Sequence, residues 1–207
     1  GHLSLMERAA KENDLTVCSI FINPLQFNNK EDFNRYPRLI DRDLELINNY
    51  GNIVFIPEAE EILSDKNIPV YDLGGLDKYM EGIYRPGHFQ GVAHIVKLFF
   101  DLINPSRAYF GQKDFQQLAI IKYLVKSLKL NIEIVECPTL RERNGLAMSS
   151  RNMLLNQSEF EKAAIIYKIL TLAKKAYQDS IITVADMKKW VNWEIKSKEF
   201  FKLEYFE

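Results

Sequence analysis

Cysteine, histidine and long apolar runs are scarce in this sequence, and each scarcity excludes a class of protein or site. Two cysteines among 207 residues leave little scope for disulfides. No apolar stretch approaches the roughly 20 residues that a membrane-spanning helix needs. Charge of one sign is also lacking, because 27 lysines and arginines oppose 28 aspartates and glutamates. A nucleic acid is therefore a poor candidate partner, and any bound anion must be held by local groups.

The two cysteines stand inside apolar runs, Cys18 in TVCSIFI and Cys137 in IEIVECP. Two thiols without a nearby histidine do not match a zinc site, and buried free thiols in strands are the simpler interpretation. The three histidines, His2, His88 and His94, show no metal-ligand spacing either. We therefore expect a cytoplasmic protein without a membrane partner, and we leave any metal ligands unassigned.

The remaining composition, 47% hydrophobic and 27% charged, is typical of a globular chain long enough to bury a sizeable core. Both ends look cut. Gly1 leads directly into a helical pattern with no strand before it, and residues 202–207 alternate like a strand and then stop. We expect a fragment that is truncated at both ends. The alternative is that Gly1 and His2 are left from a purification tag.

Short apolar segments, each followed by proline or glycine, alternate with segments of helical periodicity. Such segments are typical of strands that are buried on both faces. The strands are expected at 15–22, 53–56, 107–110 and 132–136. Strands separated by helices form right-handed parallel units. Residues 1–140 are therefore predicted to form an α/β domain, a Rossmann-like parallel sheet with helices on both faces.

The pattern changes beyond about residue 140. Ser158–Glu161 and Thr183–Asp186 have the form of the capping pairs that begin helices, and lysine-rich helical segments follow them. Together with the alternating segment 202–206, they predict a smaller α+β domain at residues 141–207. We expect this domain to be incomplete and to act as a lid over the first.

Polar clusters follow three of the predicted strands. They are residues 23–27, 111–117 and 139–152. Ligands of such sheets bind outside the carboxyl ends of the strands, so we expect the clusters to converge on one cleft. Gly111 would allow a tight turn, Asp114 would cap the next helix, and Lys113 would add positive charge where helix N–H groups favour phosphate. An ordinary loop with a solvated lysine is the alternative.

Three further features suit small polar ligands. Ser149–Arg151 combines two hydroxyl groups with a guanidinium, which suits an anion, although a capped helix start with an exposed arginine is the alternative. The amides of Asn23 and Gln26 can bind hydroxyl and carboxylate groups, or they can simply finish a turn. His2, at a helix N-terminus, can meet a phosphate oxygen.

Several longer motifs, taken together and in this order, resemble the pantothenate synthetase family. They are GHLSL, FINPLQF with RYPR, RPGHFQGV, YFGQKDFQQL and PTLRERNGLAMSSRN. The resemblance covers residues 1 to about 155 and continues weakly to EYFE at the end. It implies the HIGH-type nucleotidyltransferase superfold, with Gly1 and His2 as the last two residues of the His-x-Gly-His signature.

The resemblance implies an ATP-dependent ligase that joins pantoate to β-alanine through an enzyme-bound pantoyl adenylate, releasing AMP and pyrophosphate. It implies catalytic roles for His2, Lys113 and Arg151. Pantoate and β-alanine would be held by Gln26, Gln117, Asn23 and Arg85. The ATP-binding residues would be Gly1, His2, Gly111, Gln112, Lys113, Asp114, Leu140, Met148, Ser149, Ser150 and Arg151.

Magnesium ions and a homodimer are also implied. Asp43 matches a position linked to magnesium in the family, but the neighbouring pattern departs there, so no metal ligand is assigned. Many relatives have glutamate where Gln112 stands. Two other functions remain as alternatives: another nucleotidyltransferase of the same superfold, such as a synthetase catalytic fragment, or a non-catalytic nucleotide-binding module. The charge balance and the lack of a tRNA-binding patch argue against the synthetase fragment.

Overall fold

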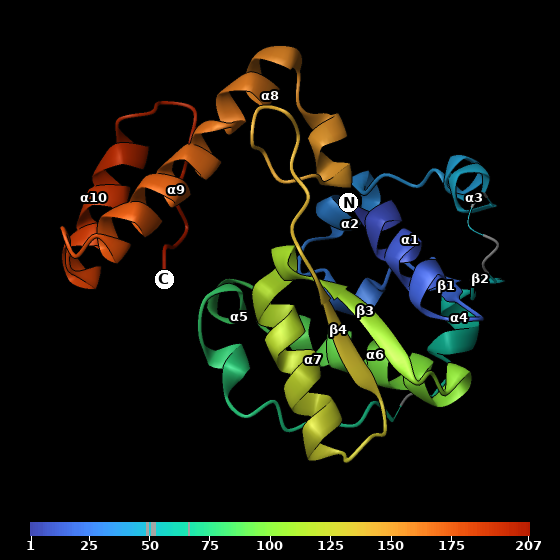
Figure 1. Cartoon of the computed structure of the whole chain (residues 1–207). Coiled ribbons are helices and arrows are strands. Elements are labelled where there is room, and N and C mark those ends of the chain that lie inside the picture. Colours follow the sequence, from blue (N-terminus) through green and yellow to red (C-terminus); the bar gives the residue numbers. More distant parts are fainter. Residues whose placement is uncertain (49, 51–52, 66) are drawn as a thin grey trace. The chain divides into compact units, whose positions relative to one another are not determined.

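Two pairs of parallel strands carry the β-structure of the chain. The structure is a computed structural model, and it describes residues 1–48, 50, 53–65 and 67–207. Strand β1 (Val17–Ser19) pairs with β2 (Ile53–Phe55), and β3 (Arg107–Gly111) pairs with β4 (Glu133–Cys137). Both pairs are parallel, and helices alternate with the strands (Figure 1). The predicted α/β class with parallel strands is confirmed.

The prediction of a single sheet through all four strands is wrong, because the described strands form two separate two-stranded sheets. Apolar segments predict which residues become strands, whereas only the ladder hydrogen bonds decide which strands are neighbours. Strand β1 is also shorter than the predicted 15–22. Its partner ends at Phe55, so that only the N–H of Ile20, 2.9 Å from the Phe55 carbonyl oxygen, continues the pairing beyond Ser19.

Helices and short 3₁₀ turns make up most of the remaining regular structure. In residues 1–139 they are α1 (His2–Glu12), η1 (Pro24–Gln26), α2 (Lys30–Arg35), α3 (Ile40–Asn48), α4 (Ala59–Ile62), η2 (Leu76–Lys78), α5 (Glu81–Tyr84), α6 (His88–Ile103), η3 (Gln112–Asp114) and α7 (Phe115–Ser127). In residues 140–207 they are η4 (Ser150–Leu154), α8 (Gln157–Ala163), α9 (Ile165–Gln178) and α10 (Val184–Lys196). No helix among the described residues has the length and apolarity to cross a membrane.

The β3–β4 pair has helices on both faces. Ala108 and Phe110 pack against the core that α6 and α7 form, in which Ile120 and Ile121 are fully buried. Tyr109, between them, points the other way and bonds to residues of α1 and the residue that follows it. This alternation follows from the two-residue period of a strand, and it fixes which helix lies on which face. Both cysteines lie in strands as free thiols, as predicted, but only Cys137 is buried and Cys18 is half-buried.

The chain divides into two compact units, residues 1–139 and 140–207. The second unit has its own core between α9 and α10, and Phe201, Leu203 and Phe206 pack against it. The strand predicted at 202–206 is wrong: residues 201–207 are all described and form no strand. Their apolar side chains cover the two helices, and no other strand of this unit lies beside them to share a ladder.

The predicted helix starts of the second unit are partly correct. Thr183 caps α10, because its hydroxyl accepts a hydrogen bond from the backbone N–H of Asp186 at 3.2 Å. Helix α8 is capped by Asn156 and not by Ser158. The Asn156 side chain accepts from the N–H of Glu159, whose carboxylate accepts from the N–H of Asn156, and this reciprocal pair is a capping box.

A buried glutamine, Gln116, ties α7 to the loop before α5. Its Nε2 donates to the carbonyl oxygens of Leu76 and Tyr79, both at 2.7 Å, and its Oε1 accepts from the N–H of Glu81 at 3.0 Å. Between these partners Met80 has a φ of 48°, which is rare for a residue with a side chain. The three bonds of Gln116 hold the loop in this conformation. Sequence patterns gave no signal for this role.

We predict that Gln116→Met lowers the free energy of unfolding by about 1–3 kcal/mol, because it leaves buried backbone groups of the loop without partners. The matched control is Gln117→Met. The Gln117 side chain is only half-buried and makes no hydrogen bond within the described residues, so this variant should keep its stability. Urea denaturation measures both. An equal loss in the two variants would show that the bonds of Gln116 do not hold the loop.

Candidate functional site

The start of α1 and the loop after β3 bring His2 into electrostatic range of Lys113 and Asp114. Desolvation is the main cause that lowers the pKa of His2 below 6.5, and the positive charges of the N-terminal amine and then of Lys113 add to it. The carboxylates of Asp114 and Asp43 act in the opposite direction on the same pKa. The imidazole is therefore neutral at pH 7, with one N–H to donate and one nitrogen that accepts.

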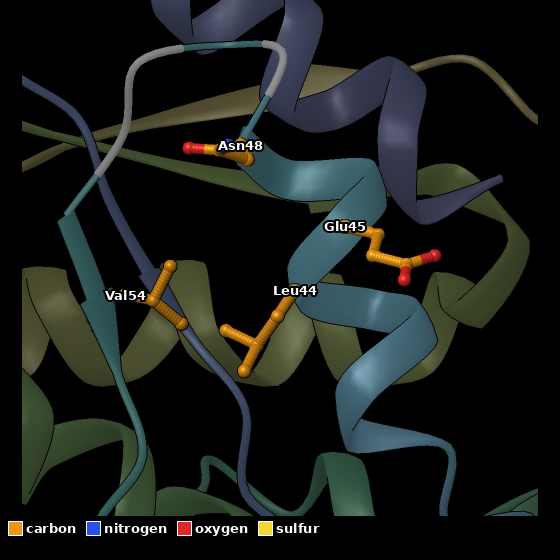
Figure 2. Close-up of a pocket in the computed structure, with 4 residues that line it drawn as sticks. All are labelled: Leu44, Glu45, Asn48 and Val54. Carbon is orange, nitrogen blue, oxygen red and sulfur yellow. The ribbon is translucent and has the colours of Figure 1, made fainter.

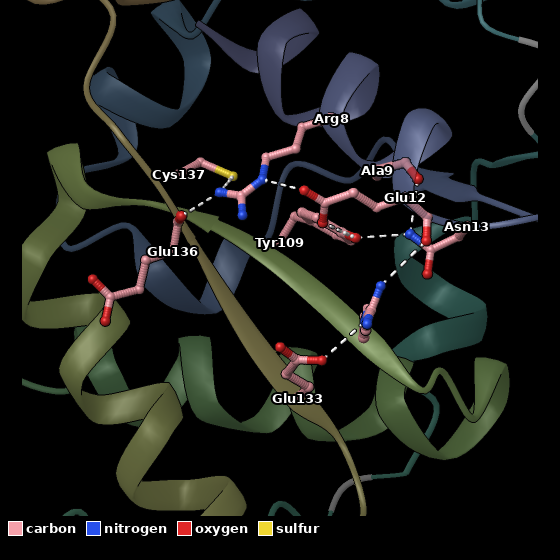
Figure 3. A network of polar contacts seen from close by, with 9 residues as sticks. Arg8, Ala9, Glu12, Asn13, Tyr109, Glu133, Glu136 and Cys137 are labelled. Atoms are coloured by element: carbon pink, nitrogen blue, oxygen red, sulfur yellow. Dashed lines mark hydrogen bonds and ion pairs between the residues drawn. The ribbon is translucent and has the colours of Figure 1, made fainter.

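Helix α1 is held against the strand pair by a network of polar contacts (Figure 3). Arg8 lies at its centre: one guanidinium nitrogen donates to the Glu136 carbonyl oxygen at 2.7 Å, and Nε contacts the Glu12 carboxylate at 2.8 Å. The Tyr109 hydroxyl donates to the same carboxylate at 2.9 Å and accepts from Asn13 Nδ2 at 2.7 Å. These bonds fix α1 on β3 and β4, and with it the position of His2 near the loop after β3.

The glycine that ends β3 does not serve the predicted purpose. Gly111 has an extended backbone with a φ of −79°, which any residue can adopt, so the expected tight turn is wrong. A Cβ atom at this position would have nothing within 4 Å. What distinguishes Gly111 is therefore the open space beside it and not its backbone conformation. A bound molecule can approach the main chain there.

The next three residues of this loop have distinct settings. Gln112 Nε2 donates to the Glu136 carboxylate at 2.9 Å, and Glu136 also forms an ion pair with Lys122. Lys113 is exposed and has no ion-pair partner among the described residues. Asp114 precedes α7 but makes no side-chain bond to the helix, so its predicted capping role is wrong. Its carboxylate is left available to act on His2.

The turn that follows β1 carries the predicted ligand amides. Asn23 is buried, with its Oδ1 accepting from the N–H of Leu25 and its Nδ2 donating to the Gly91 carbonyl oxygen, both at 3.0 Å. The amide of Asn23 therefore supports the turn. The side chain of Gln26, three residues on, is half-buried and makes no polar contact within the described residues.

His88, the first residue of α6, links this turn to the loop after β3. Its Nδ1 lies 2.7 Å from the Gln26 carbonyl oxygen. Burial lowers the pKa of His88, which its bond to the Gln26 carbonyl and the carboxylate of Asp114 partly oppose. Asp114 thus acts on the pKa of both His2 and His88. The turn after β1, the loop after β3 and the start of α1 lie in one electrostatic neighbourhood.

The two remaining candidates of the first unit differ in their settings. Arg85, at the end of α5, forms an ion pair with Glu81 at 3.0 Å. Gln117 lies in the first turn of α7, next to the loop that carries Lys113. The sequence pattern did not single out His88 for a role; its position at the start of a helix, after glycine, was the available signal.

Two pockets in the first unit contain none of these residues. One lies between α3 and β2 and is lined by Leu44, Glu45, Asn48 and Val54; Leu44 projects toward the strand, whereas Glu45 projects to the other side of the helix (Figure 2). The other adjoins residues 104–106 and 130–132, which precede β3 and β4. It therefore lies at the opposite end of these strands from Lys113.

A hairpin in the second unit brings together Leu140 and Met148, two of the predicted ATP-binding residues. The N–H of Met148 donates to the Leu140 carbonyl oxygen at 2.9 Å, and Arg141 pairs with Ala147. Gly145 closes the hairpin with a φ of 92°, where a Cβ would lie 2.6 Å from the Tyr167 ring. Ser149 caps η4, since its hydroxyl accepts from the N–H of Arg151 at 3.3 Å. That these residues face the ligand cleft stays a prediction.

We predict that Lys113→Met raises the pKa of His2, because it removes a positive charge that disfavours the imidazolium. Asp43→Asn should lower the same pKa by removing a negative charge. In the unchanged protein His2 should take up its proton only as the pH falls below 6.5. Titration of the imidazole proton resonances by NMR measures all three values. As the control, Lys126→Met on α7 should leave them unchanged, and equal shifts in the two lysine variants would refute the proximity of His2 and Lys113.

The family model described as "Pantoate-beta-alanine ligase" matches residues 1–207. The chain is 49% identical to "Pantothenate synthetase" of Flavobacterium psychrophilum and 44% identical to that of Caldicellulosiruptor bescii, covering all of this chain and 74% of each relative. A crystal structure of the pantothenate synthetase from Thermus thermophilus is similar at a TM-score of 0.92 and 40% identity, over 99% of this chain and 75% of that one. The crystal structure of a Francisella tularensis pantoate-beta-alanine ligase, "Complexed with Beta-gamma ATP and Beta-alanine", is similar at a TM-score of 0.80 and 36% identity. The match covers 93% of this chain and 72% of that one.

Proposed function

This chain belongs to the pantoate–β-alanine ligase family, and from that premise we propose how its own residues divide the work of the reaction. The activity is the joining of pantoate to β-alanine, and the synthetase fragment and the non-catalytic module are not supported. We propose ATP as the co-substrate. The Francisella relative, solved with an ATP compound and β-alanine, supports this proposal.

The proposed reaction has two steps. A carboxylate oxygen of pantoate attacks the α-phosphorus of ATP, and pyrophosphate leaves with the electrons of the broken P–O bond. The amine of β-alanine then attacks the acyl carbon of the adenylate, AMP leaves, and the amine loses a proton. The first step gathers negative charge on the phosphates, so it needs positive groups and N–H donors. The second step mainly needs the amine to be held near the activated acyl group.

The residues after β3 suit the nucleotide. The open space beside Gly111 lets phosphates approach the main chain, and the amide of Gln112 is turned toward Glu136, so that mainly its backbone faces a ligand. Lys113 offers an exposed ammonium group, and neutral His2 offers an N–H in its electrostatic range. The Leu140–Met148 hairpin and Ser149–Arg151 are proposed to complete the ATP site, with the second unit acting as a lid.

Magnesium fits this site only together with the phosphates. No three carboxylate, histidine or cysteine side chains gather into a metal site among the described residues. Mg²⁺ is commonly bound by one or two carboxylates plus substrate phosphates. Asp114 and Asp43, the carboxylates that act on the pKa of His2, are the residues proposed to reach it. Bound there, the ion would neutralise phosphate charge.

We predict that Lys113→Ala lowers turnover about 10²–10³-fold, the usual effect of removing one donor that stabilises transition-state charge. The free energy of unfolding of this variant should barely change, because the Lys113 side chain is exposed and makes no ion pair with a described residue. The assay is pantoate-dependent exchange between ATP and pyrophosphate on the full-length protein. Lys126→Ala, an exposed lysine of α7, is the matched control. Near-normal exchange in Lys113→Ala would remove this residue from the mechanism.

The turn after β1 and the start of α7 suit pantoate. Gln26 and Gln117 each present a half-buried amide without a polar partner among the described residues. A neutral amide can both donate to and accept from the hydroxyl groups of pantoate. Asn23 is proposed to act mainly by supporting the turn. Arg85 forms an ion pair with Glu81, and we propose that its positive charge also attracts a substrate carboxylate.

We predict that Gln26→Ala and Arg151→Ala affect different parts of the reaction. Loss of the Gln26 amide should weaken pantoate binding about five- to a hundredfold and leave the affinity for ATP unchanged. Loss of Arg151, proposed to bind the departing pyrophosphate, should slow adenylate formation. It should spare the second step when preformed pantoyl adenylate and β-alanine are supplied. If Arg151→Ala slowed both steps equally, its nucleotide role would be wrong.

The assembly and location follow from the family resemblance. We propose a homodimer in the cytoplasm, with pantoate, β-alanine and ATP as the small-molecule partners. Light scattering of the full-length protein gives its mass in solution and so tests the dimer.

A further inference from the structure

The Gln26 turn rests directly on the first two turns of α6. Gly91 makes this close approach possible, because a Cβ there would lie 2.5 Å from the Leu25 carbonyl oxygen. The buried Asn23 amide donates to the Gly91 carbonyl oxygen at 3.0 Å, and Asn28 Nδ2 donates to the Pro86 carbonyl oxygen at 2.6 Å. The turn and the helix start therefore form one packed unit.

The turn is weakly held by its own hydrogen bonds. It is a single 3₁₀ turn, and its two internal backbone bonds are long, 3.3 Å from the Gln26 N–H to the Asn23 carbonyl oxygen and 3.4 Å from the Phe27 N–H to the Pro24 carbonyl oxygen; only the side-chain bond from the Leu25 N–H to Asn23 Oδ1, at 3.0 Å, has ordinary length. Hydrogen bonds from N–H to a carbonyl oxygen usually measure about 2.7–3.2 Å. The Gln26 side chain has no polar contact of its own within the described residues. The direction of the Gln26 side chain is therefore set by the backbone, and that backbone depends on the Asn23 side chain and on bonds from outside the turn.

His88 supplies an outside bond to Gln26 itself. The Gln26 carbonyl oxygen can only accept, so the nitrogen 2.7 Å away, Nδ1, carries the proton. The ring is half-buried and packs edge-on against Phe89, with centroids 4.8 Å apart and planes at 70°. Burial favours the neutral form with a single proton. The geometry thus assigns that proton to Nδ1.

We propose that His88 is a positioning residue for pantoate binding, which it serves by holding the Gln26 carbonyl so that the Gln26 amide points into the substrate site. This inference rests on the proposed contact between Gln26 and pantoate. His88 itself touches the protein backbone and acts through Gln26. Its loss should change the KM for pantoate far more than the KM for ATP or kcat.

The test uses two variants of the full-length protein. His88→Phe keeps a ring against Phe89 and removes the donor, and it should raise the KM for pantoate about five- to thirtyfold, the effect of one buried hydrogen bond. His88→Asn places an amide N–H near the position of Nδ1, and it should restore most of the affinity. Should His88→Phe not fold, His88→Gln, whose amide matches Nε2 instead, takes its place.

His94→Leu is the matched control on the same helix. Its ring neighbours Tyr71 rather than the Gln26 turn, and its buried Nδ1 has no hydrogen-bond partner among the described residues. This substitution should leave the KM for pantoate unchanged. An equal rise in His94→Leu and His88→Phe would mean that any change in α6 disturbs the site, and it would overturn the proposal.

A double-mutant cycle separates this proposal from the proposed role of Gln26. In a Gln26→Ala background, His88→Phe should cause no further rise in the KM for pantoate, because the group that it positions is gone. If Gln26→Ala raises this KM and His88→Phe multiplies it by the same factor in both backgrounds, His88 acts independently and the positioning role is wrong. If Gln26→Ala alone has no effect, the contact between Gln26 and pantoate is itself wrong.

Discussion

The contact between the Arg8 guanidinium and the Glu136 carbonyl oxygen is the constraint on which the site depends. Glu136 lies near the carboxyl end of β4, and Arg8 lies further along the same helix, α1, that His2 begins. Glu12 holds Arg8 from the other side, and Tyr109 fixes Glu12 from β3 (Figure 3). A helix held by this network has little freedom to rotate. Its first residue therefore stays close to the loop after β3.

Asp114 connects the two halves of the site electrostatically. Its carboxylate opposes the desolvation that lowers the pKa of His2 and the pKa of His88, which lie at the starts of α1 and α6. Both helix starts present the positive end of a helix dipole, which favours anions. Burial, the charge of the N-terminal amine and the charge of Lys113 all lower the pKa of His2 and so keep its ring neutral. Such a site can donate hydrogen bonds to phosphate without adding a histidine cation at pH 7.

The sequence predicts the fold class better than it predicts the hydrogen bonds that hold the loops of the site in place. Apolar runs ending at proline or glycine correctly indicated four parallel strands, but the expected burial on both faces is wrong, because most residues of these strands are half-buried or exposed and Ile53 is 51% exposed. They could not show that the strands form two pairs, since period and composition carry no information about neighbours. The motifs selected Gln26, Lys113 and His2, but side-chain bonds between distant segments, such as those of Gln116 and His88, leave no local pattern.

The hydrogen bonds divide the polar residues of the site into two groups. Asn23, Gln112 and Gln116 use their amides within the protein, on a turn, a strand end and a loop. Gln26 and Gln117 belong to the same residue types, yet their amides have no polar partner within the described residues. A half-buried amide gains little by remaining unpaired, because its desolvation has a cost that only a partner offsets. The two glutamines that the protein leaves unmatched are therefore the ones we propose to bind the hydroxyl groups of the substrate, and the three amides with partners inside the protein hold the turn, the strand end and the loop in place.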